Sequence, residues 1–145
     1  MKMVHADIVV YKKFASYVKN ELPKVATNKI IAKALLEIGQ LDGPTLKRAL
    51  EWGCGPDIKI VGLVDAYGEF TPDENSNEIR IDTKVVADFE AGRGWRRTKS
   101  GKKVALAGVT LLHELTHWGD DQDGIDREGE EGEEFETRVY GLVIN

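Results

Sequence analysis

The segment Val104-Ala-Leu-Ala-Gly-Val-Thr-Leu-Leu-His-Glu-Leu-Thr-His-Trp118 decides the fold and points to the chemistry. Its apolar residues recur at helical spacing over a wide face, which predicts a helix in the core. His113 and His117 are four residues apart, so both imidazoles can reach one zinc ion at about 2.0–2.1 Å. Glu114 is rotated by about 100° around the helix axis, which suits a general base acting on water at the metal. We therefore expect a zinc site with Glu114 as catalytic base.

A catalytic zinc ion usually has three protein ligands, and the sequence leaves the third one open. Asp123 fits the last ligand position of a longer zinc motif, but that motif requires glycine where Asp120 stands and a downstream methionine turn, which the chain lacks. Glu136 flanks the apolar side of the expected last helix, one turn before Tyr140, and Glu133 lies one turn earlier. The sequence therefore favours Glu136 as the third ligand, with Glu133 as the alternative.

The remaining segments predict an α+β fold. Apolar spacing predicts helices at about residues 10–22 and 28–39, another after Gly43 and a last one at 133–143. Alternating β-branched residues predict strands at 57–64 and 78–81, the second a return strand and an edge for an extended substrate. Asp82 and Ser100 are expected helix caps around a loop or hairpin at 92–103. The prediction is N-terminal helices, a small antiparallel sheet and two C-terminal helices bearing the site.

Composition limits the class of protein. A chain of 145 residues with 41% hydrophobic residues is sufficient for one domain, expected to span residues 1–145. No apolar run reaches the ~20 residues that span a membrane, and the first residues do not resemble a cleaved secretory signal. We therefore expect no membrane partner, and either a cytoplasmic location or delivery without a cleaved signal peptide. The single Cys54 excludes an internal disulfide and leaves histidines and carboxylates as metal ligands.

Several motifs resemble the metallopeptidase toxin 3 domain of bacterial polymorphic toxins. They are His113-Glu-Leu-Thr-His-Trp-Gly-Asp120, Glu131-Gly132-x-x-Phe135-Glu136 and Val139-Tyr140-Gly141, with weaker similarity around 55–60 and 77–82. The resemblance implies a zincin-like fold, a zinc-dependent endopeptidase acting on a protein or peptide, and delivery into a target cell. It also implies a cognate immunity protein as a partner.

A more distant similarity, to clostridial neurotoxin light chains, rests on Glu136-Thr-Arg-Val-Tyr-Gly141. It implies that Glu136 is the third zinc ligand. The transition state needs an additional donor to its oxyanion, and the sequence offers Tyr140, Tyr67 and the arginines. We expect Tyr140 in this role.

Two other functions are compatible with the sequence. One is a catalytically idle zinc-binding or protein-interaction module, although such a module would not need Glu114. The other is a nucleic-acid-directed toxin that uses the basic stretch at 93–103, where Trp95 is the one aromatic side chain for base stacking. The net charge of −5 argues against a nucleic-acid partner.

Overall fold

The computed structural model describes residues 1–123 and 130–145, without the side chain of Asp123. The N-terminal third is helical: α1 (His5–Val10), α2 (Lys12–Ser16), a π-helical turn η1 (Tyr17–Glu21), a 3-10 helix η2 (Leu22–Thr27), α3 (Lys29–Ile38) and α4 (Gly43–Leu50). Two side-chain caps mark the starts of α3 and α4. The side chain of Asn28 accepts hydrogen bonds from the amides of Ile30 and Ile31, and that of Asp42 accepts one from Thr45.

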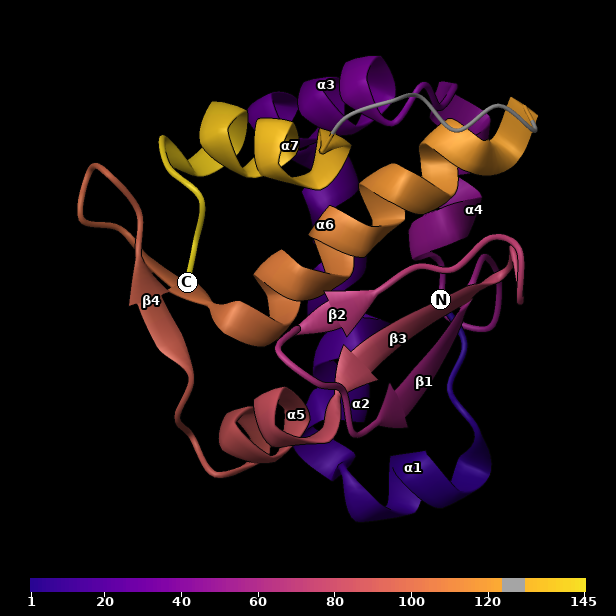
Figure 1. The fold of residues 1–145 in the computed structure, drawn as a ribbon, viewed down its shortest axis with the longest axis vertical. Coiled ribbons are helices and arrows are strands. Elements are labelled where there is room, and N and C mark those ends of the chain that lie inside the picture. The colour runs from indigo at the N-terminus through magenta and orange to yellow at the C-terminus, as the bar shows by residue number, and fades with distance from the viewer. Residues whose placement is uncertain (124–129) are drawn as a thin grey trace.

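The central part of the chain forms a three-stranded sheet in the order β1 (Asp57–Val61), β3 (Glu78–Asp82), β2 (Gly68–Glu69). β2 and β3 are antiparallel, so β3 is a return strand as expected, whereas β1 joins the other side of β3 in parallel. The prediction that residues 78–81 form an edge is wrong, because β1 and β2 occupy both sides of β3. The edge that lies beside the functional helix is β2 (Figure 1).

The segment between the sheet and the functional helix contains α5 (Thr83–Glu90) and the hairpin of β4 (Trp95–Arg97) and β5 (Lys103–Ala105). Asp82 precedes α5 at the expected cap position, but its Oδ1 atom accepts from the amide of Leu63 instead of capping the helix. The Ser100 cap is wrong: the functional helix, α6 (Leu106–Asp120), begins after Ala105, and Ser100 lies in the hairpin turn beside Thr98.

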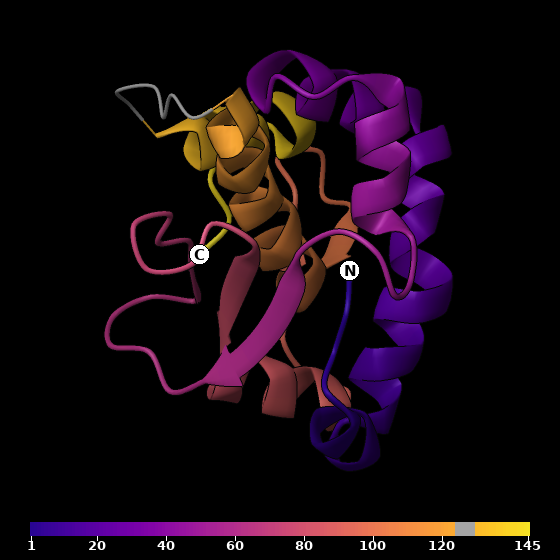
Figure 2. The ribbon, with the colours of Figure 1, turned by 90° about the vertical axis from the view of Figure 1, so that its right-hand side faces the viewer.

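The core surrounds α6, which runs between the N-terminal helices and the sheet (Figure 2). Fully buried Leu111 and Leu115 of α6 share one apolar cluster with Leu35 of α3, Ile79 of β3 and Phe135 of the last helix. That helix, α7 (Glu131–Tyr140), packs against α3 and α6 and begins two residues before the expected 133. The α+β class is therefore confirmed. None of the helices in the described residues has the length and hydropathy required to span a bilayer.

Candidate functional site

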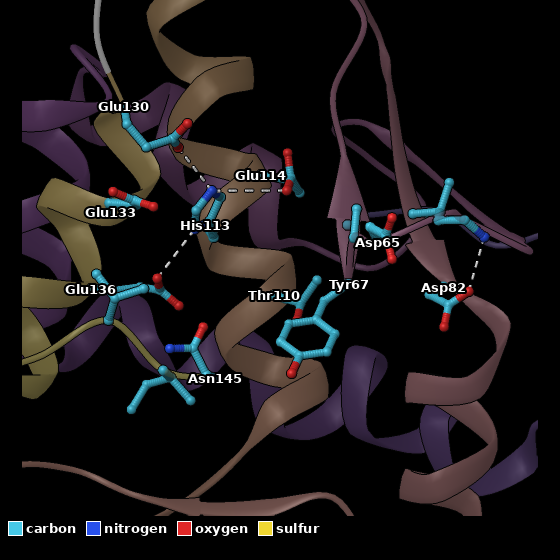
Figure 3. A pocket seen from close by; sticks show the side chains of 15 residues that line it. Asp65, Tyr67, Asp82, Thr110, His113, Glu114, Glu130, Glu133, Glu136 and Asn145 are labelled. Atoms are coloured by element: carbon cyan, nitrogen blue, oxygen red, sulfur yellow. Dashed lines mark hydrogen bonds and ion pairs between the residues drawn. The ribbon is translucent and has the colours of Figure 1, made fainter.

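The predicted pair of histidines lies on one face of α6, toward the first turn of α7. The two imidazole rings are 5.2 Å apart between centroids and are inclined by 55°. Their Nε2 atoms face the same carboxylate oxygen: Oε1 of Glu130 lies 3.1 Å from Nε2 of His113 and 2.8 Å from Nε2 of His117. Glu130 immediately precedes α7, so the chain brings a carboxylate from one helix terminus between two imidazoles of another helix. Figure 3 shows Glu130 beside His113.

These three side chains have the composition and spacing of a metal site. One ligand atom from each of His113, His117 and Glu130 lies within 4.8 Å of the other two. Two imidazole nitrogens and one carboxylate oxygen are a set that catalytic zinc sites use, with a fourth position left for water or substrate. The described residues at this position therefore fit a zinc ion.

A second carboxylate lies behind each imidazole. Oε2 of Glu136 is 3.4 Å from Nδ1 of His113, and Oε2 of Glu131 is 3.1 Å from Nδ1 of His117. Both glutamates are nearly inaccessible to solvent, at 4% and 3% exposure. The Glu131 oxygen lies within ion-pair distance, but no donor among the described residues is aligned with it as a hydrogen bond. A buried carboxylate is costly without a positive or donating partner, and Nδ1–H of His117 is the group that faces it.

Neighbouring carboxylates also affect the protonation of His113. Burial by itself lowers the pKa of His113, but the hydrogen bond with Glu136 and the charges of Glu114 and Glu130 raise it above its ordinary value.

Glu114 lies next to the histidines and is 6% exposed. Burial raises the pKa of its carboxyl group to about 7, although the two imidazoles oppose the shift. Its Oε1 atom is 4.0 Å from Nε2 of His113, and among the described residues no group donates a hydrogen bond to it. Glu114 is therefore a buried carboxylate that is directed toward the ligand nitrogens and remains available for another donor.

Two glycines allow the backbone to approach these side chains closely. A Cβ atom on Gly132 would lie 2.2 Å from Cδ2 and Nε2 of His113, so the first turn of α7 rests directly on the imidazole. A Cβ atom on Gly68 would lie 2.7 Å from Cγ2 of Thr110 and 2.9 Å from Oε1 of Glu114. Any larger residue at either position would displace a side chain of the site.

A cleft of about 720 Å³ opens beside these residues, with His113, Glu114, Glu130 and Glu136 in its walls. Glu133 also lines the cleft, but it lies outside the group of three potential metal ligands. The side chain of Asp123 falls outside the described part of the chain. Glu136 lies on the Nδ1 side of His113, opposite the Nε2 atom that faces Glu130.

The two tyrosines considered as oxyanion donors lie in different places. Tyr67 precedes β2 and lines the cleft near Thr110 (Figure 3). Tyr140 lines a different cavity, with Tyr17 and residues of the β4–β5 hairpin, and packs edge-to-face against Phe135. Burial raises the pKa of Tyr140 above its ordinary range.

Sequence reasoning did not identify Glu130 and Glu131 as site residues. Helical spacing of Phe135, Val139 and Tyr140 predicts a start at 133, which leaves both glutamates in an acidic loop. A signal was present in Glu130-Glu131-Gly132, because a glycine in the first turn of a helix allows a close approach by another side chain.

One comparison with known proteins identifies a family. A family model described as metallopeptidase toxin 3 matches residues 7–141, which is nearly the whole chain. Searches of curated proteins and of solved structures gave no match.

Proposed function

Because the chain belongs to the metallopeptidase toxin 3 family, we propose that it is a zinc-dependent endopeptidase whose active site is built on α6 and α7. One observation carries the proposal: Nε2 of His113 and of His117 face the same Glu130 oxygen at 3.1 and 2.8 Å, beside a buried Glu114 that has no hydrogen-bond donor among the described residues.

In this proposal His113, His117 and Glu130 hold the zinc ion. Oε2 of Glu136 and of Glu131 lie 3.4 and 3.1 Å from the Nδ1 atoms of His113 and His117, and with a metal bound each carboxylate would hold its imidazole as the Nδ1–H tautomer, which leaves Nε2 free to bind the metal. This assigns Glu136, the ligand expected from the sequence, an orienting role. A bound zinc ion supplies a Lewis acid that polarises the scissile carbonyl and lowers the pKa of a water molecule to about 7.

Glu114 is the general base. Its carboxylate accepts a proton as the oxygen of water bonds to the carbonyl carbon, and it returns that proton to the amine nitrogen when the C–N bond breaks. Tyr67 is the donor to the oxyanion, because it is the tyrosine in the cleft, whereas Tyr140 belongs to another cavity. Within the described residues no arginine lines the cleft.

The family name supports a role as a toxin, so the substrate is a protein or peptide of a cell into which the domain is delivered. An immunity protein that blocks the cleft would protect the producing cell.

Two observations weigh against the other functions. An idle module gains nothing from burying Glu114 without a donor, because an unpaired buried carboxylate costs stability. A nucleic-acid toxin would use Trp95 for stacking, but the ammonium of Lys103 covers one face of that ring at 4.6 Å from its centroid.

The first prediction tests the enzyme activity. Purified protein should bind about one zinc ion per chain and cleave unfolded protein substrates, and Glu114→Gln should keep the zinc ion but lose at least about 100-fold in kcat/KM, since general bases contribute roughly 10²–10⁴-fold. Zinc content is measured by atomic emission, and cleavage by mass spectrometry of the products.

His113→Ala and His117→Ala should lose both zinc and activity. Glu134→Gln is the matched control, because Glu134 is an exposed residue of α7 outside the cleft, and it should retain both. If Glu114→Gln cleaves as fast as the wild type, Glu114 is not the base. If both histidine variants keep their zinc, the metal site itself is wrong.

A further inference from the structure

The cleft beside the histidines has strongly acidic walls. Its carboxylates are Asp65, Asp82, Glu114, Glu130, Glu133 and Glu136. Within the described part of the chain, no lysine or arginine contributes to the lining. A volume of about 720 Å³ is large enough to hold side chains of a bound peptide.

Three of these six carboxylates are neither ligands nor orienting groups at the proposed metal site. Asp65, Asp82 and Glu133 lie outside the group of potential ligands, and residues 1–122 and 130–145 place no cation within ion-pair distance of them. Asp82 uses Oδ1 to accept the amide of Leu63 at 2.9 Å. Asp65 and Asp82 stand on the strand side of the cleft, opposite Glu133 of α7 (Figure 3).

Two arginines next to cleft residues are engaged with other partners. Arg80 of β3 pairs with Glu69, Glu74 and Glu78 at 3.1, 2.6 and 3.0 Å. Arg96 of the hairpin donates from Nε to the backbone oxygen of Asn145 at 2.7 Å and does not line the cleft. The negative potential of Asp65, Asp82 and Glu133 is therefore directed to whatever enters the cleft.

A second feature, apart from the acidic walls, points to a ligand in this cleft. Glu114 is 6% exposed, lines the same space, and has no hydrogen-bond donor among the described residues. The ion-pair contact of Glu114 with Nε2 of His113 is 4.0 Å long, which is beyond hydrogen-bond distance. Buried polar groups are nearly always paired, so this carboxylate is available to accept a hydrogen bond from a molecule in the cleft.

We propose that the cleft selects peptides with lysine or arginine close to the scissile bond. This inference rests on the proposed peptidase function and adds the substrate class. Asp65 and Asp82 receive a basic side chain on the strand side, and Glu133 receives one on the α7 side. Long basic side chains suit this geometry, because their apolar stems can lie along the cleft while the charge reaches the wall.

Cleavage of a degenerate peptide library, read by mass spectrometry, tests the selectivity. We expect lysine and arginine to be enriched about tenfold over aspartate and glutamate next to the cleavage site at about 10 mM salt, and the ratio to fall toward one at about 1 M, where the screening length is only about 3 Å. Cleavage without this enrichment would overturn the inference while leaving the peptidase function intact.

Variants locate the effect. The double variant Asp65→Asn, Glu133→Gln should lose most of the basic enrichment. Asparagine is suitable at position 65 because that residue has φ of 53°, a left-handed conformation that asparagine tolerates. The control Glu134→Gln removes a charge from the same helix outside the cleft and should keep the enrichment. An enrichment that is identical in all three proteins contradicts the assignment to these walls.

A binding measurement separates this inference from the function. Zinc-loaded Glu114→Gln is titrated with a lysine-containing peptide and with its glutamate counterpart, using calorimetry. We expect the lysine peptide to bind at least about tenfold more tightly at about 10 mM salt. If the basic peptide binds but no peptide is ever cut by the wild type, the peptidase function fails and the selectivity stands. Equal affinity of the two peptides rejects the selectivity.

Discussion

At the scale of single residues, the site assigns two carboxylates to each imidazole. Nε2 of both histidines faces Glu130, which is half exposed, whereas each Nδ1 faces a buried glutamate of its own. The buried pair cannot leave their histidines without exposing an unpaired charge to the core. The exposed Glu130 side chain is held less tightly and can adjust its position to a metal ion.

This difference predicts a ranking of zinc affinities. Glu130→Gln should weaken zinc binding most, because it removes a proposed direct ligand. Glu131→Gln and Glu136→Gln should each cost about 10–100-fold, as is typical when a residue that orients a metal-bound histidine is lost. Glu133→Gln, which removes a cleft carboxylate outside the ligand group, is the control and should change affinity little. Competition with a chromogenic chelator measures all four.

The same series tests the ligand expected from the sequence. If Glu136→Gln releases zinc while Glu130→Gln retains it, Glu136 is the third ligand and Glu130 only approaches the histidines in the absence of metal.

At the scale of elements, the site depends on how closely α7 approaches α6. Gly132 stands in the first turn of α7, and its missing side chain leaves room for the imidazole of His113. Alanine at this position would place a Cβ atom 2.2 Å from Nε2, so either the ring must rotate or the helix must move away.

Gly132→Ala should therefore weaken zinc binding at least about tenfold and lower the free energy of unfolding by about 1–3 kcal/mol, the usual cost of overpacking. Gly43→Ala is the matched control, because nothing lies within 4 Å of a Cβ atom there and its φ is unremarkable. Chelator competition and denaturant unfolding provide the two readouts. Wild-type zinc affinity in Gly132→Ala would contradict the close approach.

Some of the helices and site residues could be predicted from the sequence, and others could not. The histidine pair and Glu114 were predictable because their geometry follows from the period of one helix. The start of α7 was not, since Glu131 and Gly132 are buried by contact with α6 and not by an apolar pattern of their own. Ser100 and Asp82 were expected caps from residue type alone, and each makes another hydrogen bond instead.

The pairing of the strands in the sheet could not be predicted from the sequence either. Local alternation predicts the strands but not their neighbours, and residues 62–77 between β1 and β3 are long enough to carry β2 and to bring β3 between the other two. The edge beside α6 is therefore β2, a strand of two residues that is too short for an alternating pattern to reveal.

At the scale of the whole molecule, the proposed zinc site joins the centre of the core to the C-terminal helix. α6, which bears the two histidines, runs through the middle of the apolar cluster. α7 supplies the carboxylates behind the imidazoles and contributes Phe135 to the same cluster. A ligand that bridges the two helices binds the folded chain and not the unfolded one, so its binding free energy adds to the stability of the whole domain.

Zinc at 100 times its Kd should add about 2.7 kcal/mol to the free energy of unfolding, which for a domain of this size raises Tm by roughly 5–10 °C. Differential scanning fluorimetry with zinc and with excess chelator measures the shift. Glu114→Gln should show the full shift because Glu114 is no ligand, whereas His113→Ala should show none. A shift retained in His113→Ala would mean that zinc binds elsewhere on the chain. A shift absent from the wild type would mean that the two helices do not hold the ion together, and the carboxylates around the histidines would then serve only to compensate the charge of the imidazoles.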